Sequence, residues 1–116
     1  MAIISLPRKL TARNVREAPE AQGVFTLWDG DERIYIGYTP GNRSLRDSLR
    51  EHFALAERGV IAATHYSWET SAIGKTRQAE ILAACLERNG RLPRYNREGS
   101  PLETLARSAT DLRARR

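Results

Sequence analysis

The chain has 116 residues, 41% of them hydrophobic, and its 19 lysines and arginines outnumber its 14 aspartates and glutamates to give a net charge of +5. This length allows one modest core and is too short for two domains. The single cysteine excludes an internal disulfide, and with only two separated histidines it excludes the usual zinc sites. The positive charge instead favours a polyanionic partner. No apolar run reaches the length of a membrane span or of a signal-peptide core, so we expect a cytoplasmic protein without a membrane partner.

The segment before the core is expected to be short and helical. Residues 10–17 form a helix candidate that leads into Pro19, and we expect residues 1–22 to pack on the core as a lead-in segment.

A β-hairpin is predicted next. Residues 24–28 and 34–38 are β-branched and aromatic runs. The Asp29-Gly30 pair between them is a strong hairpin signal, because glycine tolerates the positive φ of a tight turn. Pairing of the two runs brings Phe25 and Tyr35 near one another, either directly across the strands or diagonally.

Two helices and a third strand follow the hairpin. Apolar residues at helical spacing predict a helix over residues 44–59, and a polar and β-branched stretch predicts a strand over 64–70. A second helix is predicted over 76–88. Its expected apolar stripe consists of Ala79, Leu82, Ala83 and Leu86. These elements make one α+β domain over residues 23–96, in which helices flank a small three-stranded sheet.

The C-terminal part looks appended to that domain. Ser100 and Pro101 form a helix start, and leucines and alanines at helical spacing follow them. We expect residues 97–116 to be a helical extension with a basic end.

Several linked motifs resemble the GIY-YIG nuclease family. Gly23-Val24-Phe25 and Tyr35-Ile36-Gly37 stand in the two hairpin strands, and Pro93-Arg94-Tyr95-Asn96 follows the last core helix. The family has the same order of elements: two strands, a helix, a third strand, a second helix and then this tetrapeptide. The resemblance therefore covers residues 23–96. It implies a metal-dependent DNA endonuclease that hydrolyses phosphodiester bonds and depends on a separate target-selecting protein.

The resemblance also implies where the site residues lie. The family carries its acidic metal ligand on the helix before the Pro-x-Tyr-Asn element, and Glu80 is the best match, with Glu87 as the alternative. One carboxylate, with waters and phosphate oxygens, suits Mg²⁺ or Mn²⁺. The other positions that match the family's motifs are Gly23, Phe25, Gly37, Ser48 and Asn96.

Two motif positions depart from the family. Phe25 stands where the family has a tyrosine, and it cannot hydrogen-bond to water or phosphate. Positioning or deprotonating water would then pass to Tyr35, to Tyr38, to a metal-bound hydroxide or to His52.

The second departure is on the first core helix. Ser48 occupies the slot of an arginine that would stabilise charge on the phosphate. Arg46 and Arg50 lie two residues to either side of it, which rotates each side chain nearly to the opposite face of the helix. They remain the candidates for the arginine's role, and His52 matches a position where the family often carries histidine or tyrosine.

Arginine supplies most of the positive charge, and its planar fork suits phosphate. The expected nucleic-acid contacts are Arg43, Lys75, Arg77, Arg91 and Arg94. Gly74-Lys75-Thr76 is similar to the end of a phosphate-binding loop, but residue 69, where its first glycine would stand, is glutamate, so no NTP is expected.

Two other functions are consistent with the sequence. The departures at Phe25 and Ser48 are also expected in a degenerate site, in which the fold serves as a DNA-binding or protein-interaction module. A third and weaker hypothesis is binding of RNA or single strands through exposed Tyr38, Tyr66 and Trp68.

Overall fold

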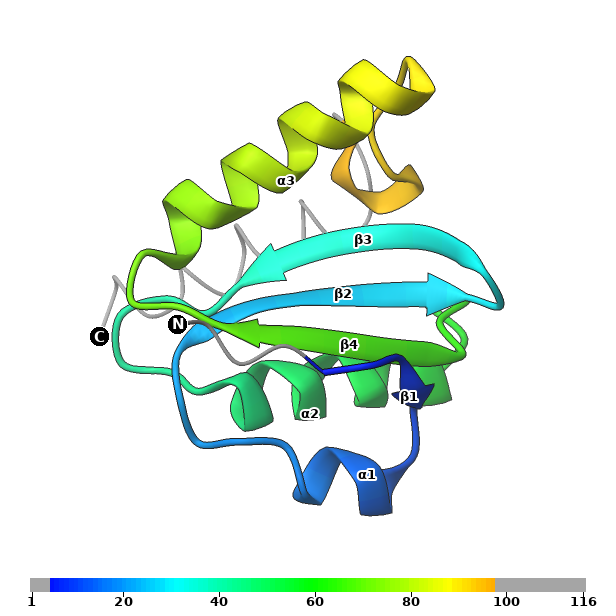
Figure 1. The fold of residues 1–116 in the computed structure, drawn as a ribbon. Helices are drawn as coiled ribbons and strands as arrows, with labels where there is room; N and C mark the ends of the chain where they lie inside the picture. Colours follow the sequence, from blue (N-terminus) through cyan, green and yellow to red (C-terminus); the bar gives the residue numbers. More distant parts are fainter. Residues whose placement is uncertain (1–4, 98–116) are drawn as a thin grey trace, which may run out of the picture.

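An antiparallel sheet forms the centre of the computed structural model, which describes residues 5–97 (Figure 1). Its strand order is β1-β4-β2-β3. In chain order the elements are β1 (Arg8–Lys9), α1 (Ala12–Arg16), β2 (Gly23–Asp29), β3 (Glu32–Tyr38), α2 (Leu45–Glu57), β4 (His65–Thr70), α3 (Gly74–Asn89) and the short 3₁₀ helix η1 (Arg94–Asn96).

The predicted hairpin is confirmed. β2 and β3 pair antiparallel around Gly30, whose φ of 62° is the left-handed conformation that glycine accepts readily. Phe25 lies opposite Gly37, and Leu27 lies opposite Tyr35. The two aromatic residues are therefore diagonal neighbours on one face of the sheet. A register shift after Leu27 lets the hairpin bend towards its tip.

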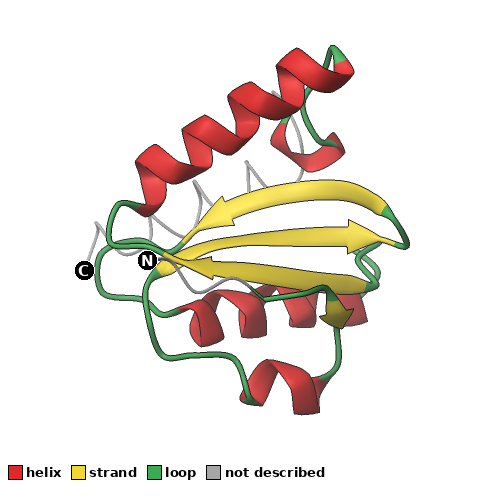
Figure 2. Cartoon of the chain, in the orientation of Figure 1, coloured by secondary structure: helices red, strands yellow, loops and turns green. Residues whose placement is uncertain are grey.

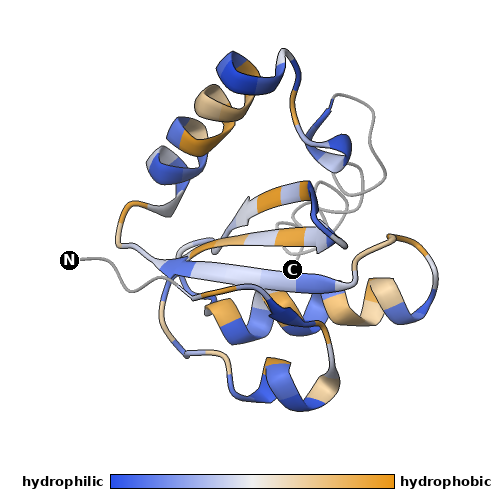
Figure 3. Cartoon of the chain, turned by 45° about the vertical axis from the view of Figure 1, so that its right-hand side comes forward, coloured by the Kyte–Doolittle hydropathy of each residue, from blue (hydrophilic) through white to orange (hydrophobic). Residues whose placement is uncertain are grey.

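Helices cover both faces of the sheet. α1 and α2 lie on one face and α3 on the other, as Figures 1 and 2 show, while η1 lies against the edge strand β3. The core is on the α2 face, where Leu27, Ile34, Leu45, Leu49 and Tyr66 are fully buried. In Figure 3, β2 and β3 carry hydrophobic bands, whereas β4 has none and is pale, with blue towards its ends.

The prediction of a three-stranded sheet is wrong by one strand, because within residues 5–97 the sheet has four strands. Arg8 and Lys9 pair with Tyr66 and His65 at the outer edge of β4. This strand has only two residues, both charged and exposed, so it has no alternation of polar and apolar residues.

The predicted apolar stripe of the second core helix is also wrong in part. Ala79, Ala83 and Leu86 are exposed, and Cys85 is the buried residue of α3. Polar contacts set the rotation of this helix: Arg77 bonds to Glu69 of β4 and Gln78 to the backbone of β3. The helical face that continues from residues 77 and 78 through 81 to 85 therefore turns to the sheet.

Two further expectations concern the ends of the chain and the membrane. The predicted helix over residues 97–116 lies outside the described residues, apart from Arg97. Among residues 5–97, no helix has both the length and the apolar character needed to cross a membrane.

Candidate active site

Three aromatic rings meet where the two motif tripeptides face α2. The centroid of the Phe25 ring lies 6.0 Å from that of Tyr35 and 5.0 Å from that of His52. The Tyr35 and His52 rings are stacked, with centroids 5.5 Å apart and an interplanar angle of 24°. The structure therefore brings together two of the predicted site residues, Tyr35 and His52, with the motif residue Phe25 between them and the core.

Both motif glycines lie where the neighbouring atoms leave no space for a side chain. A Cβ atom on Gly37 would lie 2.5 Å from Phe25 Cζ and 2.8 Å from Tyr35 Cε2, so only glycine lets both rings lie over β3. A Cβ atom on Gly23 would lie 2.1 Å from the carbonyl oxygen of Glu69, so glycine is needed where β2 approaches β4. Both glycines are required by close packing, whatever the chemistry of the site.

His52 is held in one orientation by its own helix. Its Nδ1 lies 2.7 Å from the carbonyl oxygen of Ser48, one turn earlier in α2. A carbonyl oxygen only accepts, so Nδ1 carries the proton and Nε2 is the acceptor of the neutral ring. Burial lowers the pKa of His52 below its usual value, although the bond to Ser48 and the charge of Glu51 act in the opposite direction. The neutral form therefore dominates at pH 7.

Tyr35 and His52 are both partly buried. Within residues 5–97, the Tyr35 hydroxyl and His52 Nε2 form no hydrogen bond with another side chain or with the backbone. Burial of the Tyr35 ring raises the pKa of its hydroxyl, and nearby Tyr38 raises it further. Tyr35 is therefore a neutral hydrogen-bond donor at pH 7.

The arginine candidates of α2 do not join this cluster. Ser48, in the arginine slot, is buried. The Arg46 guanidinium donates to the carbonyl of Ala18 at 2.8 Å and pairs with Glu20 at 2.7 Å, so it faces the segment before β2. Arg50 is exposed and forms no ion pair with the described residues.

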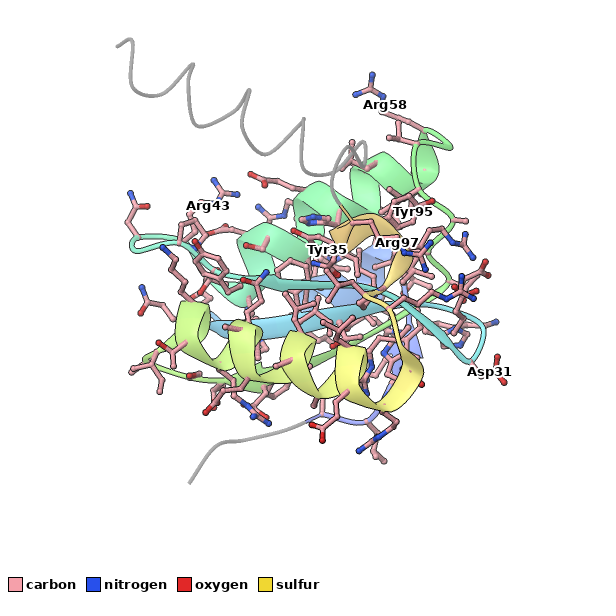
Figure 4. The ribbon with its side chains drawn as sticks, turned by 90° about the horizontal axis from the view of Figure 1, so that it is seen from above. Asp31, Tyr35, Arg43, Arg58, Tyr95 and Arg97 are labelled. Atoms are coloured by element: carbon pink, nitrogen blue, oxygen red, sulfur yellow. The ribbon has the colours of Figure 1, made fainter. Side chains whose placement is uncertain are left out.

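Arg43 lies just before α2 and pairs with Glu51. Figure 4 shows Arg43 and Arg58 at opposite ends of this helix, with Tyr35 between them. The helix begins with a capping box, in which Ser44 and Asp47 each accept a hydrogen bond from the other's backbone N–H. This cap sets where α2 starts, and therefore where Ser48 and His52 stand.

Glu80 lies on the other face of the sheet. Its side chain on α3 is 59% exposed and pairs with Arg77 at 3.4 Å. Arg77 bonds more closely to Glu69 of β4, at 2.6 Å. Residues 5–97 contain no group of three or more His, Cys, Asp or Glu side chains that could hold a metal ion. A metal on Glu80 would thus take most of its ligands from water or phosphate oxygens.

Asn96, the last residue of the Pro-Arg-Tyr-Asn element, closes the free edge of β3. Ile36 N–H donates to Asn96 Oδ1 at 2.8 Å, and Asn96 Nδ2 donates to the Ile36 carbonyl at 2.9 Å. Gln78 Nε2 donates to the same carbonyl at 3.0 Å. Sequence reasoning did not find Gln78, because a glutamine on a helix carries no signal of its partner.

The remaining predicted nucleic-acid contacts lie on or beyond α3. Lys75 and Arg91 are exposed. Arg94 pairs with Glu32 at 2.8 Å and with Asp29 at 3.9 Å, at the tip of the hairpin. These basic side chains and Tyr35 therefore belong to different faces of the sheet.

No family model, curated protein or solved structure matched this chain in the comparisons made with each. The likeness to the GIY-YIG nucleases therefore rests on the chain's own motifs and on the order of its elements. Its functional residues have to be judged by their geometry.

Proposed function

We propose that the chain hydrolyses phosphodiester bonds in DNA, with Tyr35 and His52 at the reaction centre. The observation that carries the proposal is the stacked pair itself. His52 has a fixed tautomer and an Nε2 that forms no hydrogen bond within residues 5–97, and it lies beside the hydroxyl-bearing ring of the Tyr-Ile-Gly motif. An oriented neutral imidazole next to a hydrogen-bond donor is a usual arrangement for general-base catalysis.

The two rings would divide the work between them. His52 Nε2 accepts a proton from the attacking water, which compensates for the hydroxyl that Phe25 lacks. The neutral Tyr35 hydroxyl donates to a phosphate oxygen. Phe25 has no polar part in this scheme and serves to hold the two rings at their observed separation.

A divalent cation, Mg²⁺ or Mn²⁺, belongs to the proposal through Glu80. Because Glu80 and Tyr35 lie on opposite faces of the sheet, a bound cation would neutralise a phosphate of the same DNA on the α3 face, not the one at Tyr35. The exposed Glu80 carboxylate leaves room for a shell of waters, which Mg²⁺ prefers. Arg77 has its closer bond to Glu69, so it stays anchored if Glu80 turns to a metal.

A second candidate is a module that binds DNA without cleaving it. It is favoured by the separation of Glu80 from Tyr35 on opposite faces of the sheet and by the engagement of Arg46 with Glu20. In that case the cluster of Phe25, Tyr35 and His52 is part of the core only.

Cleavage of a pooled set of single-stranded, nicked, flapped and branched DNAs, with Mg²⁺, Mn²⁺ or EDTA, tests the proposal. The parent chain should cleave only with metal. His52→Ala and Tyr35→Phe should each slow cleavage by a factor on the order of 10², as expected for a lost general base or transition-state donor, while DNA binding persists. Glu80→Ala should abolish the response to metal.

Tyr38→Phe is the matched control, because it also removes a tyrosine hydroxyl from β3, but on the other face of the sheet. It should leave cleavage within about twofold, since this hydroxyl has no role in the proposed chemistry. No cleavage by the parent chain or by Phe25→Tyr, with DNA still bound, would establish the second candidate instead.

A further inference from the structure

A recess with a volume of about 820 Å³ lies on the face of the sheet opposite Tyr35 and His52. It is bordered by α3, η1 and the hairpin end of β2 and β3, in the region where α3 rises away from the sheet in Figure 1. This volume is in the range of pockets that hold small ligands. Among residues 5–97, six arginines line it: Arg33, Arg77, Arg88, Arg91, Arg94 and Arg97.

Two of the six arginines are neutralised by carboxylates. Arg77 pairs with Glu69 and Glu80, and Arg94 pairs with Glu32 and Asp29. Arg97 uses its Nε to donate to the carbonyl of Leu92 at 3.0 Å.

Arg33, Arg88 and Arg91 form no ion pair with any of the described residues. The lining also includes the carboxylates of Asp31, Glu32 and Glu80, so the six arginines leave it with a net positive charge, which a bound anion offsets. Since each guanidinium group presents a planar fork of N–H donors, the oxygens of a phosphate suit them best.

Arg33 also belongs to an ordered aromatic platform. Its guanidinium carbon lies 5.0 Å from the centre of the Trp28 ring, and its Nη1 donates to Cys85 Sγ at 3.5 Å. Trp28 is fixed in turn, because its Nε1 donates to Ser67 Oγ at 3.1 Å. Arg33 is exposed, and a guanidinium group held over an indole ring is a surface on which a nucleic-acid base can stack.

We propose that this recess is a second binding site, which takes a nucleotide through its phosphate and its base. Arg33, Arg88 and Arg91 contact the phosphate, and the platform of Arg33 on Trp28 stacks with the base. A free nucleotide and a nucleotide within a single strand share this chemistry. The inference goes beyond the proposed hydrolysis and does not require it, because the recess and the Tyr35–His52 pair lie on opposite faces of the sheet.

Binding is measured in EDTA, so that no metal-dependent cleavage interferes. The probes are inorganic phosphate, dAMP and a short labelled oligodeoxyadenylate. Calorimetry measures the binding of the two small ligands, and fluorescence anisotropy measures the binding of the strand. Arg33→Gln and Arg91→Gln should each weaken binding of dAMP or of the strand by about tenfold, as expected for a charge-assisted contact. Arg33→Lys, which keeps the charge but loses the planar fork, should weaken it as well.

Arg58→Gln is the matched control, since it removes one exposed arginine at the end of α2, on the other side of the sheet (Figure 4). This variant should change the affinity for dAMP and for the strand by no more than about twofold, because salt largely screens an exposed charge on the far side of the sheet. Circular dichroism and thermal melting confirm that each variant is folded.

The outcomes separate the sources of the ligand. If Arg33→Gln and Arg91→Gln weaken binding of the strand but not of dAMP, the recess binds single strands. If the same variants also weaken binding of dAMP, the recess binds free nucleotides too. Binding of inorganic phosphate alone, equal weakening by Arg58→Gln, or no binding at all overturns the inference. Cleavage that Tyr35→Phe abolishes, together with unchanged binding in the recess variants, would refute the second site and leave the proposed function standing.

Discussion

The two positions that depart from the GIY-YIG motifs both shape the surroundings of His52. Phe25 lies 5.0 Å from the His52 ring and is buried in the core. The carbonyl of Ser48 holds Nδ1 of the same ring. A tyrosine and an arginine at these positions would place a hydroxyl and a charge beside the imidazole. The departures thus give His52 an apolar environment, in which its neutral form is favoured.

This environment makes the stability of the protein depend on pH. The pKa of His52 is lower in the folded state than the value of about 6.5 of an unfolded chain. Around pH 6 the unfolded state therefore binds more protons, so the contribution of His52 is complete above pH 6.5 and is lost as the pH falls towards the folded pKa. We expect the melting temperature to fall between pH 7.5 and about pH 5.5.

The control for this experiment is a substitution of the other histidine, His65. His52→Gln should flatten the loss of stability in this pH range, whereas His65→Gln should leave it in place. The range also stays above the titration of Asp47, whose pKa is lowered by the backbone N–H and the hydroxyl of Ser44. An unchanged pH profile in His52→Gln would mean that the buried imidazole does not carry the effect.

At the scale of elements, within residues 5–97 the edge strand β3 is closed by side chains and not by another strand. Asn96 bonds to both the N–H and the carbonyl of Ile36, and Gln78 bonds to that carbonyl too. An unpaired strand edge invites pairing with another chain. Asn96 therefore protects β3 and fixes η1 beside it, which also keeps Tyr95 packed on the core.

Asn96→Ala removes both bonds to Ile36 and leaves its N–H without a partner from the described residues. We expect a loss of about 1–3 kcal/mol in the free energy of unfolding, measured by urea denaturation. Asn96→Asp keeps the acceptor for the Ile36 N–H and should cost less. Asn42→Ala, in an exposed loop, should change stability by less than about 0.5 kcal/mol. Equal stability of Asn96→Ala and the parent chain would contradict a structural role for this residue.

Local patterns were enough to predict most elements, because the hairpin, both core helices and the third strand each carry a turn, a cap or a periodic run. β1 could not be predicted, since two charged residues become a strand only by pairing with β4. The rotation of α3 was missed for a similar reason, because it depends on bonds from Arg77 and Gln78 to distant strands.

Some residues of the candidate site could also be predicted from the sequence, whereas the positions of others depend on the fold. Tyr35 and His52 were predicted individually, and the register of the hairpin against α2 then brings them together. The position of Glu80 behind the sheet could not be predicted, because it depends on how α3 crosses the strands. The recess arginines are spread over β3, α3 and the segment after it, so only the fold shows that they share one surface.

For the whole molecule, the sheet separates two surfaces of different chemistry. The face with α2 carries a neutral tyrosine and a neutral histidine, whereas the face with α3 presents the arginine recess. A general base must be unprotonated at the working pH, as a neutral histidine is, whereas affinity for a strand depends on positive charge. One strand could engage both surfaces by passing around the β3 edge. Substitutions on one face should then change the rate and those on the other should change the affinity.

The charge of the recess also sets how binding responds to salt. Each phosphate that an arginine neutralises releases counterions, so the logarithm of the association constant falls linearly with the logarithm of salt concentration. For a single strand contacted by Arg33, Arg88 and Arg91, the expected slope is about −2. Arg33→Gln combined with Arg91→Gln should make the slope shallower, at about −0.7, and Arg58→Gln should leave it unchanged. Affinity measured by anisotropy between low and physiological salt gives the slope directly. A slope near zero in the parent chain would mean that phosphate contacts contribute nothing to binding, and the net charge of +5 would then have no part in recognising nucleic acid.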